Sequence, residues 1–193
     1  MDLVEAKNNL KQLIKMFSSF NENDLDEVIR CFHPRSIKKN SILLSEGETS
    51  REFYFIYKGC IRTYFISKQG HEKTRYIMIE PSIGTALTSF ISQKTSFEFI
   101  DVLEDSELLV ISRNDFYKLT ETIPAWKDFY LKIMEMAYSF QTAKIESLVT
   151  LSAKQRYEQL LKAQPKLIQR LSNKVLASYL DVTQETLSRL KSK

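Results

Sequence analysis

Four polar side chains near the end of the chain are well suited to recognising another molecule. They comprise an amide, a carboxylate, a hydroxyl and a guanidinium on one face of a helix predicted after residue 183: Gln184, Glu185, Ser188 and Arg189. In a DNA major groove an Arg can donate two hydrogen bonds to guanine, a Glu can accept from cytosine, and a Gln can pair with adenine. This helix face is therefore predicted to read base edges.

Two short helices joined by a tight turn would position these side chains. The apolar positions that fall on their inner faces are Leu176, Ala177, Leu180, Leu187 and Leu190. Asp181 lies in the turn, where a left-handed backbone is tolerated by Asp better than by bulky residues. Ser172 and Thr183 are placed to cap the two helices, because a hydroxyl can accept a hydrogen bond from a free N–H group of the first turn. The pattern predicts a helix-turn-helix.

The basic residues are concentrated around this motif. From residue 154 onward there are nine Lys or Arg against three Asp or Glu, whereas the whole chain has a net charge of +4. The first 153 residues therefore carry a small net negative charge. A basic C-terminal end is what binding to DNA phosphates requires.

Composition excludes several other classes of protein. With 193 residues and 43% hydrophobic residues, the chain can bury a sizeable core. Cys31 and Cys60 lie far apart without a CxxC pattern, so no metal site or cysteine-held cluster is predicted. The sequence shows no signal pattern and no run of 18 apolar residues, so we expect a soluble, cytoplasmic protein without a membrane partner.

An enzyme is the main alternative class. His33 and His71 are the only histidines, and no nucleophile elbow, Walker loop or HExxH motif accompanies them. No catalytic residue is predicted, and the chain is not expected to be an enzyme.

The periodicity indicates an α+β fold. Helical patterns cover residues 3–17 and 24–31, and Asn21 or Asn23 could cap the second. Between residues 35 and 112 the period changes to that of short strands separated by turn signals. The predicted strands are 36–38, 41–44, 52–57, 61–67, 73–79, 97–103 and 108–111. Strands this close together predict an antiparallel β-roll, a double-stranded β-helix or jelly-roll with flanking helices.

A long helix is predicted from Pro124 for about 25 residues, well beyond the typical length of about 11 to 12. Apolar residues recur along it at spacings of four and three, as in a coiled coil: Phe129, Ile133, Met136, Phe140 and Ala143. The stripe could pack only on the strand domain, but a second apolar set lies beside it: Tyr130, Met134 and Ala137. We therefore expect a homodimer, which would place two recognition helices about 34 Å apart. The expected domains are 1–123, the dimerisation helix 124–151, and 152–193.

This order of parts resembles the CRP/FNR family of bacterial transcription regulators. The resemblance covers nearly the whole chain and rests on SEGETSREFYFIYKGCIRTYF, on the spacing from Pro124 through Arg156, and on VTQETLSRL. It implies a cyclic-nucleotide-binding-like β-roll, a dimerisation helix, and double-stranded DNA and RNA polymerase as partners. It also implies base reading by Gln184, Glu185 and Arg189, with Thr183 and Ser188 near phosphate.

The effector segment departs from the family pattern. Members that bind cyclic AMP open this segment with Gly-Glu and close it with Arg-Ser. Here the stretch is IGTALTSFISQKTSFEF, in which Gly84 is kept, Thr85 replaces the Glu, and Thr95 with Ser96 replaces the Arg-Ser pair. Lys94 is adjacent, but an ammonium lacks the fork of a guanidinium. Cyclic AMP is therefore not the expected effector.

Two hypotheses remain for the β-roll, and no cofactor is evident. Either it binds an unidentified small molecule, or it is an empty remnant that serves as a dimer scaffold. The predicted pocket lining is Gly84, Thr85, Leu87, Lys94, Thr95, Ser96, Phe97 and Phe99, with Gln141 and Thr142 from the long helix. A ligand-binding module without DNA binding is the further alternative.

The C-terminal end is the second departure from the family pattern. Family members usually continue into a two-stranded wing, and no wing is expected after the recognition helix here. Phosphate contacts would then come from Lys154, Arg156, Arg170, Lys174, Lys191 and Lys193. DNA binding is accordingly expected to be modest in affinity and strongly salt-dependent.

Overall fold

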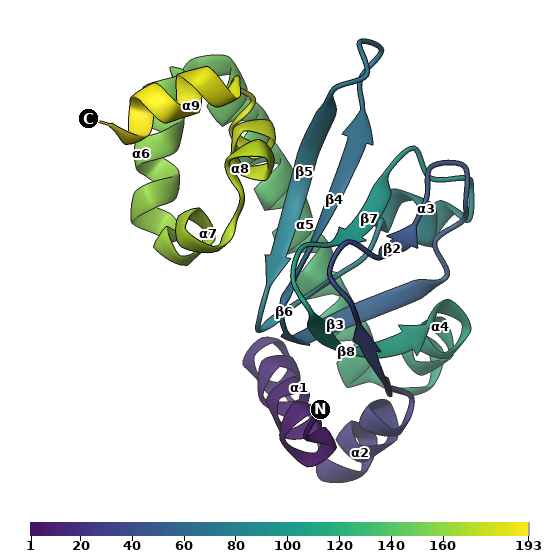
Figure 1. Cartoon of the computed structure of the whole chain (residues 1–193). Coiled ribbons are helices and arrows are strands. Elements are labelled where there is room, and N and C mark those ends of the chain that lie inside the picture. The colour runs from purple at the N-terminus through teal and green to yellow at the C-terminus, as the bar shows by residue number, and fades with distance from the viewer. Residues whose placement is uncertain (193) are drawn as a thin grey trace. The chain divides into compact units, whose positions relative to one another are not determined.

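The computed structural model describes residues 1–192 and confirms the α+β fold (Figure 1). The helices are α1 Leu3–Phe17, α2 Glu22–Arg30, α3 Leu87–Ser92, α4 Arg113–Thr122, α5 Pro124–Thr150, α6 Ala153–Ala163, α7 Pro165–Arg170, α8 Asn173–Leu180 and α9 Gln184–Lys191. The strands are β1 His33–Ile37, β2 Ile42–Leu44, β3 Glu52–Lys58, β4 Cys60–Ile66, β5 Glu72–Ile79, β6 Ser82–Gly84, β7 Phe99–Val102 and β8 Ser106–Ser112.

The chain divides into two compact units. Unit 1 contains Met1–Thr63 and Ile77–Glu135, and unit 2 contains Tyr64–Tyr76 and the chain from Met136 onward. The tip of the β4–β5 hairpin therefore groups with the C-terminal helices, and α5 contributes to both units. This division differs from the three consecutive segments expected from the sequence, because the hairpin tip reaches residues far away in the chain.

Two four-stranded sheets form the β-roll. Their strand orders are β1-β8-β3-β6 and β2-β7-β4-β5. The pairs β1 with β8, β3 with β8, β3 with β6 and β2 with β7 are all antiparallel, as predicted. Within the β-roll domain, two short elements were missed, β6 and α3. Neither reaches a length at which hydrophobic periodicity distinguishes helix from strand.

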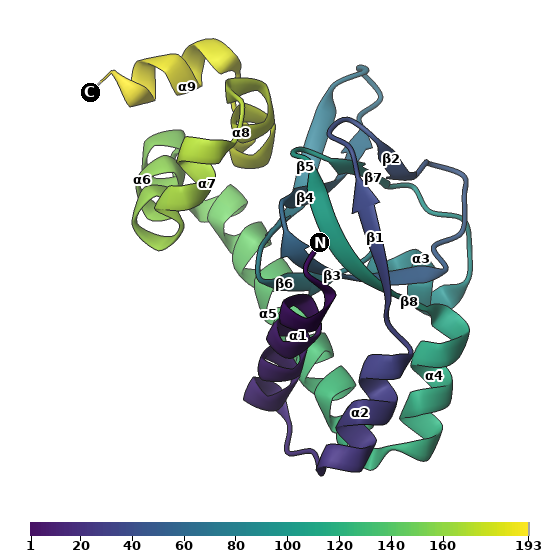
Figure 2. The ribbon, with the colours of Figure 1, turned by 60° about the horizontal axis from the view of Figure 1, so that its bottom comes forward.

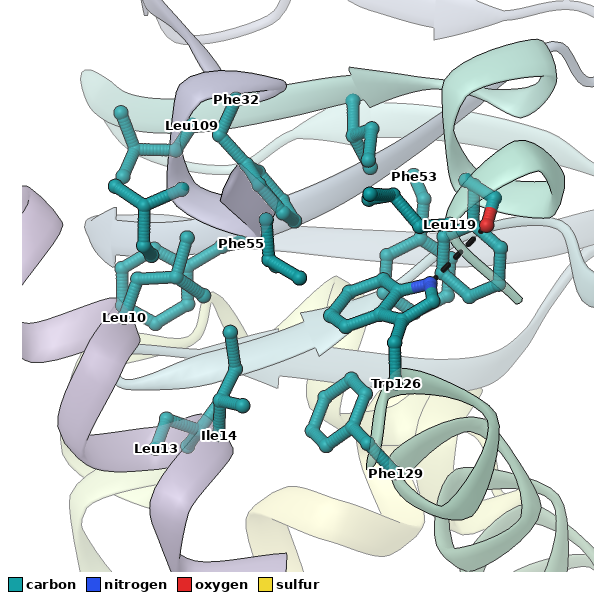
Figure 3. Packing of buried hydrophobic residues seen from close by; sticks show 14 of the residues in the cluster. Leu10, Leu13, Ile14, Phe32, Phe53, Phe55, Leu109, Leu119, Trp126 and Phe129 are labelled. Carbon is teal, nitrogen blue, oxygen red and sulfur yellow. Dashed lines mark hydrogen bonds between the residues drawn. The ribbon is translucent and has the colours of Figure 1, made fainter. Parts of the chain in front are cut away.

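The helices α1, α2 and α4 gather with the first half of α5 against the β3–β8 face (Figure 2). Trp126 of α5 is fully buried in their shared core, and its indole N–H donates to the Phe116 carbonyl at 3.1 Å (Figure 3). Phe129 stacks on Trp126 with 4.8 Å between ring centroids. Aromatic packing thus fixes the start of α5 onto the β-roll.

A buried ion pair joins two strands of the second sheet. The Arg62 guanidinium on β4 donates to both carboxylate oxygens of Asp101 on β7, at 2.8 and 2.9 Å. Such a pair fixes register, since each charge buried alone would be strongly destabilising. The sequence analysis did not identify it, because a single Arg and a single Asp 39 residues apart carry no local pattern.

The helix-turn-helix has the local structure that the sequence predicts. The Ser172 hydroxyl accepts from Val175 N–H at the start of α8, and Thr183 accepts from Thr186 N–H at the start of α9. Asp181 adopts the left-handed conformation between them, with φ 54° and ψ 51°. Leu187 and Ala177 are buried, so the two helices pack through their apolar faces.

Two cations outside the motif hold the carbonyl end of α8. The Lys144 ammonium on α5 donates to the Tyr179 carbonyl at 2.5 Å and lies 3.7 Å from the centroid of the Tyr179 ring. The Arg156 guanidinium on α6 donates to the Leu180 carbonyl at 3.0 Å and to the Leu151 carbonyl at 2.7 Å. The Tyr179 and Leu180 carbonyls, at the end of α8, accept no hydrogen bond from an N–H group of their own helix. The negative end of the helix dipole favours cations at this position.

We predict a pH-dependent stability that is traceable to Lys144. Burial, followed by the charge of Arg156, lowers the pKa of Lys144 from 10.5 to about 8. Between pH 8 and 10.5 the unfolded chain binds this proton and the native chain does not, so the group's contribution to the free energy of unfolding increases with pH. Urea unfolding followed by circular dichroism at pH 7.5 and 9.5 should show this increase in the native chain relative to Lys144→Met.

The control for this prediction is Lys154→Met, which removes a lysine whose side chain is 66% exposed. This variant should keep the pH dependence of the native chain. Identical pH dependence in the native chain and in Lys144→Met would contradict the assignment.

Candidate DNA-binding interface

The predicted reading face is exposed to solvent on α9. Gln184, Glu185, Ser188 and Arg189 are all exposed, while Leu187 between them is fully buried. The Arg189 Nε makes only a long contact of 3.4 Å to the Glu185 carbonyl in its own helix. The polar ends of this face are therefore presented outward by a helix whose other side is fixed in the core of the motif.

Glu185 is held in its ionised form. Hydrogen bonds from its own backbone N–H and from the Thr183 hydroxyl, together with the charge of Arg189, lower the pKa of the Glu185 carboxyl. An ionised carboxylate can only accept hydrogen bonds, which suits the amino group of cytosine. The Thr183 hydroxyl, predicted to lie near phosphate, is used in the cap of α9.

The predicted phosphate-binding cations have different surroundings. Lys191 donates to the Asn173 side chain at 2.6 Å, which ties the end of α9 to the start of α8. Lys174 is exposed on α8 and pairs with Glu72 at 2.5 Å. Lys154 pairs with Glu158, Arg170 is half-buried, and Arg156 is committed to the carbonyl end of α8. Lys193 lies outside the described residues.

The effector segment of the β-roll is closed by its own hydrogen bonds. Buried Thr85 donates to the Glu52 carbonyl at 2.7 Å and accepts from the Ser50 hydroxyl at 2.8 Å. Ser89 accepts from the Ser50 N–H at 3.0 Å, and the Gln93 amide donates to the Ser50 carbonyl at 3.0 Å. The hydroxyl and amide groups that could meet a ligand are thus used to hold the segment itself.

The other predicted lining residues do not share one environment. Ser96 is buried and bonds to the backbone of Glu98, whereas Lys94, Thr95 and Phe97 are exposed. Gly84, Leu87 and Phe99 are half-buried. A Cβ at Gly84 would meet the Met78 sulfur at 2.5 Å, so a larger residue here would require the Met78 side chain to shift.

Gln141 and Thr142 belong to unit 2 rather than to the unit that contains the effector segment. The Gln141 amide, oriented with its oxygen toward Arg75, accepts from that guanidinium at 2.6 and 2.9 Å. Thr142 is exposed. Their predicted role in the pocket therefore stays a prediction.

The predicted dimer seam on α5 requires correction. Phe129 and Ile133 are only 1% and 9% exposed, because they belong to the core of unit 1. Phe140 packs its ring on Tyr76 at 4.7 Å. Only Met136 and Ala143 of the predicted set are exposed. The periodic stripe that the sequence shows is mainly the face that α5 turns toward its own chain.

A different face of α5 carries exposed apolar side chains. We call it the outer stripe, and its members are Leu131, Tyr138, Ile145 and Val149. Tyr138 and Val149 are 76% and 79% exposed, which is unusual for large apolar residues on a regular helix. The spacings of seven, seven and four residues keep all four on one face.

No helix in residues 1–192 is both long enough and apolar enough to cross a membrane. Within the same residues there is no cluster of three His, Cys, Asp or Glu side chains arranged to hold a metal ion. Cys31 and Cys60 are free thiols, and burial raises the pKa of Cys31.

Comparison with known proteins agrees with this architecture. Residues 34–122 match the cyclic nucleotide-binding domain. The anaerobic regulatory protein of Bacillus subtilis (strain 168) is 31% identical over 97 residues, which are 50% of this chain and 41% of that protein. The matched segment therefore spans less than half of that relative's length.

Solved structures extend the likeness beyond the β-roll. FixK2 from Bradyrhizobium japonicum has a TM-score of 0.72 at 16% identity and covers 83% of each chain. A transcriptional regulator of the CRP/FNR family from Eubacterium rectale has a TM-score of 0.69 at 18% identity, over 89% of this chain and 82% of that one. Residues 34–122 thus match a cyclic nucleotide-binding domain, and the whole chain, with its long helix and helix-turn-helix after that domain, has the fold of these solved structures.

Proposed function

We propose that this protein is a homodimeric, sequence-specific DNA-binding transcription regulator. The observation that carries the proposal is the exposed polar face of α9, supported from behind by the buried Leu187 and by the capped turn at Asp181. The similar Eubacterium rectale structure, that of a transcriptional regulator of the CRP/FNR family, supports the same use of the fold. RNA polymerase, implied by the family resemblance, stays a prediction. This function needs no catalytic residue.

Sequence reading is assigned to Arg189 and phosphate binding to Lys191. After selection of preferred sites from a random duplex library, Arg189→Ala should lose about 1 to 3 kcal/mol of discrimination at one base position. Lys191→Ala should weaken binding to all duplexes similarly. It should also reduce the slope of log K against log salt concentration by about 1, because one phosphate contact is lost. Fluorescence anisotropy against the selected duplex and a scrambled one measures both.

Absence of duplex binding by the native chain at low salt would exclude the regulator and favour a module that does not bind DNA. Loss of discrimination in Lys191→Ala, with none in Arg189→Ala, would reverse the assignment of the two residues.

Dimerisation is assigned to the outer stripe of α5. Each Å² of apolar surface that is buried contributes about 25 cal/mol of free energy, which would make the pairing of two such stripes favourable. Two copies joined along α5 would also supply the two recognition helices that a palindromic site requires. This replaces the seam predicted from the sequence, whose first two residues, Phe129 and Ile133, are covered by the chain itself.

Tyr138→Asp and Ile145→Asp should each convert the dimer to a monomer, because a carboxylate in an apolar helix seam would be desolvated without a partner. Sedimentation equilibrium measures the outcome. The matched control is Met136→Asp, which changes another exposed apolar residue of the same helix, 50% exposed, outside the outer stripe. Dissociation by Met136→Asp but not by Tyr138→Asp would restore the seam predicted from the sequence.

The β-roll is proposed to sense a small effector other than cyclic AMP. The segment from residue 84 to residue 97 contains no Arg, and its Thr85 hydroxyl is engaged with Ser50 and Glu52. A cyclic phosphate would therefore lack the charge-assisted pair that a guanidinium provides. A ligand-free scaffold is the alternative for this domain.

Thermal unfolding with 1 mM (~10⁻³ M) cyclic AMP should show no stabilisation beyond that produced by 5′-AMP, the control for general nucleotide effects. A specific rise of about 3 °C or more corresponds to about 1 kcal/mol of stabilisation, that is, to a ligand concentration about four times the dissociation constant, and would contradict this reading. Screening of other metabolites by the same measurement separates the effector hypothesis from the scaffold.

A further inference from the structure

The tip of the β4–β5 hairpin lies on the outer face of α8, within unit 2. The Ser178 hydroxyl of α8 donates to the Glu72 carbonyl at 2.9 Å. The Ser178 hydroxyl oxygen also accepts from the Thr74 N–H at 2.8 Å and from the Thr74 hydroxyl at 2.9 Å. One serine of the helix-turn-helix is therefore bound to the edge of a strand about 100 residues away in the chain.

Two ion pairs flank this serine. The Lys174 ammonium, one turn before Ser178 on α8, pairs with the Glu72 carboxylate at 2.5 Å. The Lys73 ammonium pairs with the carboxylate of Asp181 at the turn. The hairpin thus contacts both ends of α8, and it does so through groups that are charged or strongly polar.

The base of the hairpin tip is attached to α5 in the same unit. Arg75 donates to the Gln141 amide oxygen, and the Tyr76 ring meets the Phe140 ring edge to face at 4.7 Å. Side chains of β5 from Glu72 to Tyr76 therefore connect α5 to the helix-turn-helix. We call this set of contacts the hairpin clasp.

The clasp occupies a surface that DNA would need. In a helix-turn-helix the first helix crosses the sugar-phosphate backbone while the second enters the major groove. Lys174 is on that first helix, and its charge is neutralised by Glu72 where a phosphate would otherwise pair with it. Ser178, an additional donor suited to a phosphate oxygen, is bound to the hairpin backbone.

We propose that the β4–β5 hairpin and the DNA backbone compete for the outer face of α8, so that the closed hairpin clasp inhibits DNA binding. The proposal rests on the proposed DNA-binding function. Both ion pairs are partly exposed, with side-chain exposures of 64% and 24% in one and 41% and 46% in the other, and pairs in contact with solvent are individually weak. The two ion pairs can therefore exchange partners at modest cost, which is a property that a reversible inhibitory contact requires.

A reversible cross-link tests the proposal directly. Thr74→Cys combined with Ser178→Cys places two thiols where the two hydroxyl oxygens are 2.9 Å apart. Oxidation should join them and hold the hairpin on α8. We expect the oxidised protein to bind a random-sequence 30-bp duplex (~100 Å long) at least about ten-fold more weakly than the same protein after reduction, measured by anisotropy at low salt.

The single variants Thr74→Cys and Ser178→Cys, treated with the same oxidant, control for Cys31 and Cys60. Equal DNA affinity of the oxidised and reduced double variant would overturn the proposal. Failure of the two thiols to join would also overturn it, because the hairpin would then lie away from α8. If neither the reduced variant nor the native chain binds duplex DNA, the proposed function itself fails, which is a different result.

A second variant opens the clasp without a cross-link. Glu72→Gln frees Lys174 while leaving every cation in place. We expect about two- to five-fold tighter binding to the same duplex, the change that corresponds to one exposed ion pair. The control is Glu146→Gln on α5, which alters net charge equally at an exposed position. An equal gain in both variants would show a general charge effect and count against competition at α8.

Discussion

The carbonyl end of α8 is the point on which the geometry of the helix-turn-helix depends. Here the backbone must stop one helix, pass through the left-handed Asp181, and start the next at a fixed angle. Lys144 from α5 and Arg156 from α6 both donate to the last carbonyls of α8. The angle of the recognition helix is therefore coupled to two other helices through charge-assisted hydrogen bonds rather than through the turn alone.

The long helix α5 has separate functions on its different faces. Trp126, Phe129 and Ile133 anchor its first half in the core of unit 1, and Lys144 holds α8 from its second half. The outer stripe stays exposed in the single chain, as the proposed dimer requires. A helix with apolar residues on more than one face can contact a core, a partner and a helix-turn-helix at once. A change in its position would therefore alter its contacts with all three.

Polar side chains of the effector segment and of the β4–β5 hairpin lie in contrasting environments. In the effector segment, Ser50, Thr85 and Ser89 are satisfied internally in a buried network, which makes the segment rigid. In the hairpin, Glu72 and Lys73 make ion pairs that are partly exposed to solvent. The effector segment is thus held by buried hydrogen bonds, whereas the two ion pairs of the hairpin clasp are in contact with solvent.

The amino-acid sequence by itself determined the local features: the caps Ser172 and Thr183, the left-handed Asp181, helix α1, and most strands of the β-roll. These follow from interactions within a few residues, which a sequence displays directly. Only the tertiary structure decided which face of α5 is covered, since periodicity marks apolar faces without saying what covers them. It alone also joined Arg62 to Asp101, Lys144 to Tyr179, and Glu72 to Lys174, because contacts between distant residues leave no spacing pattern in a single chain.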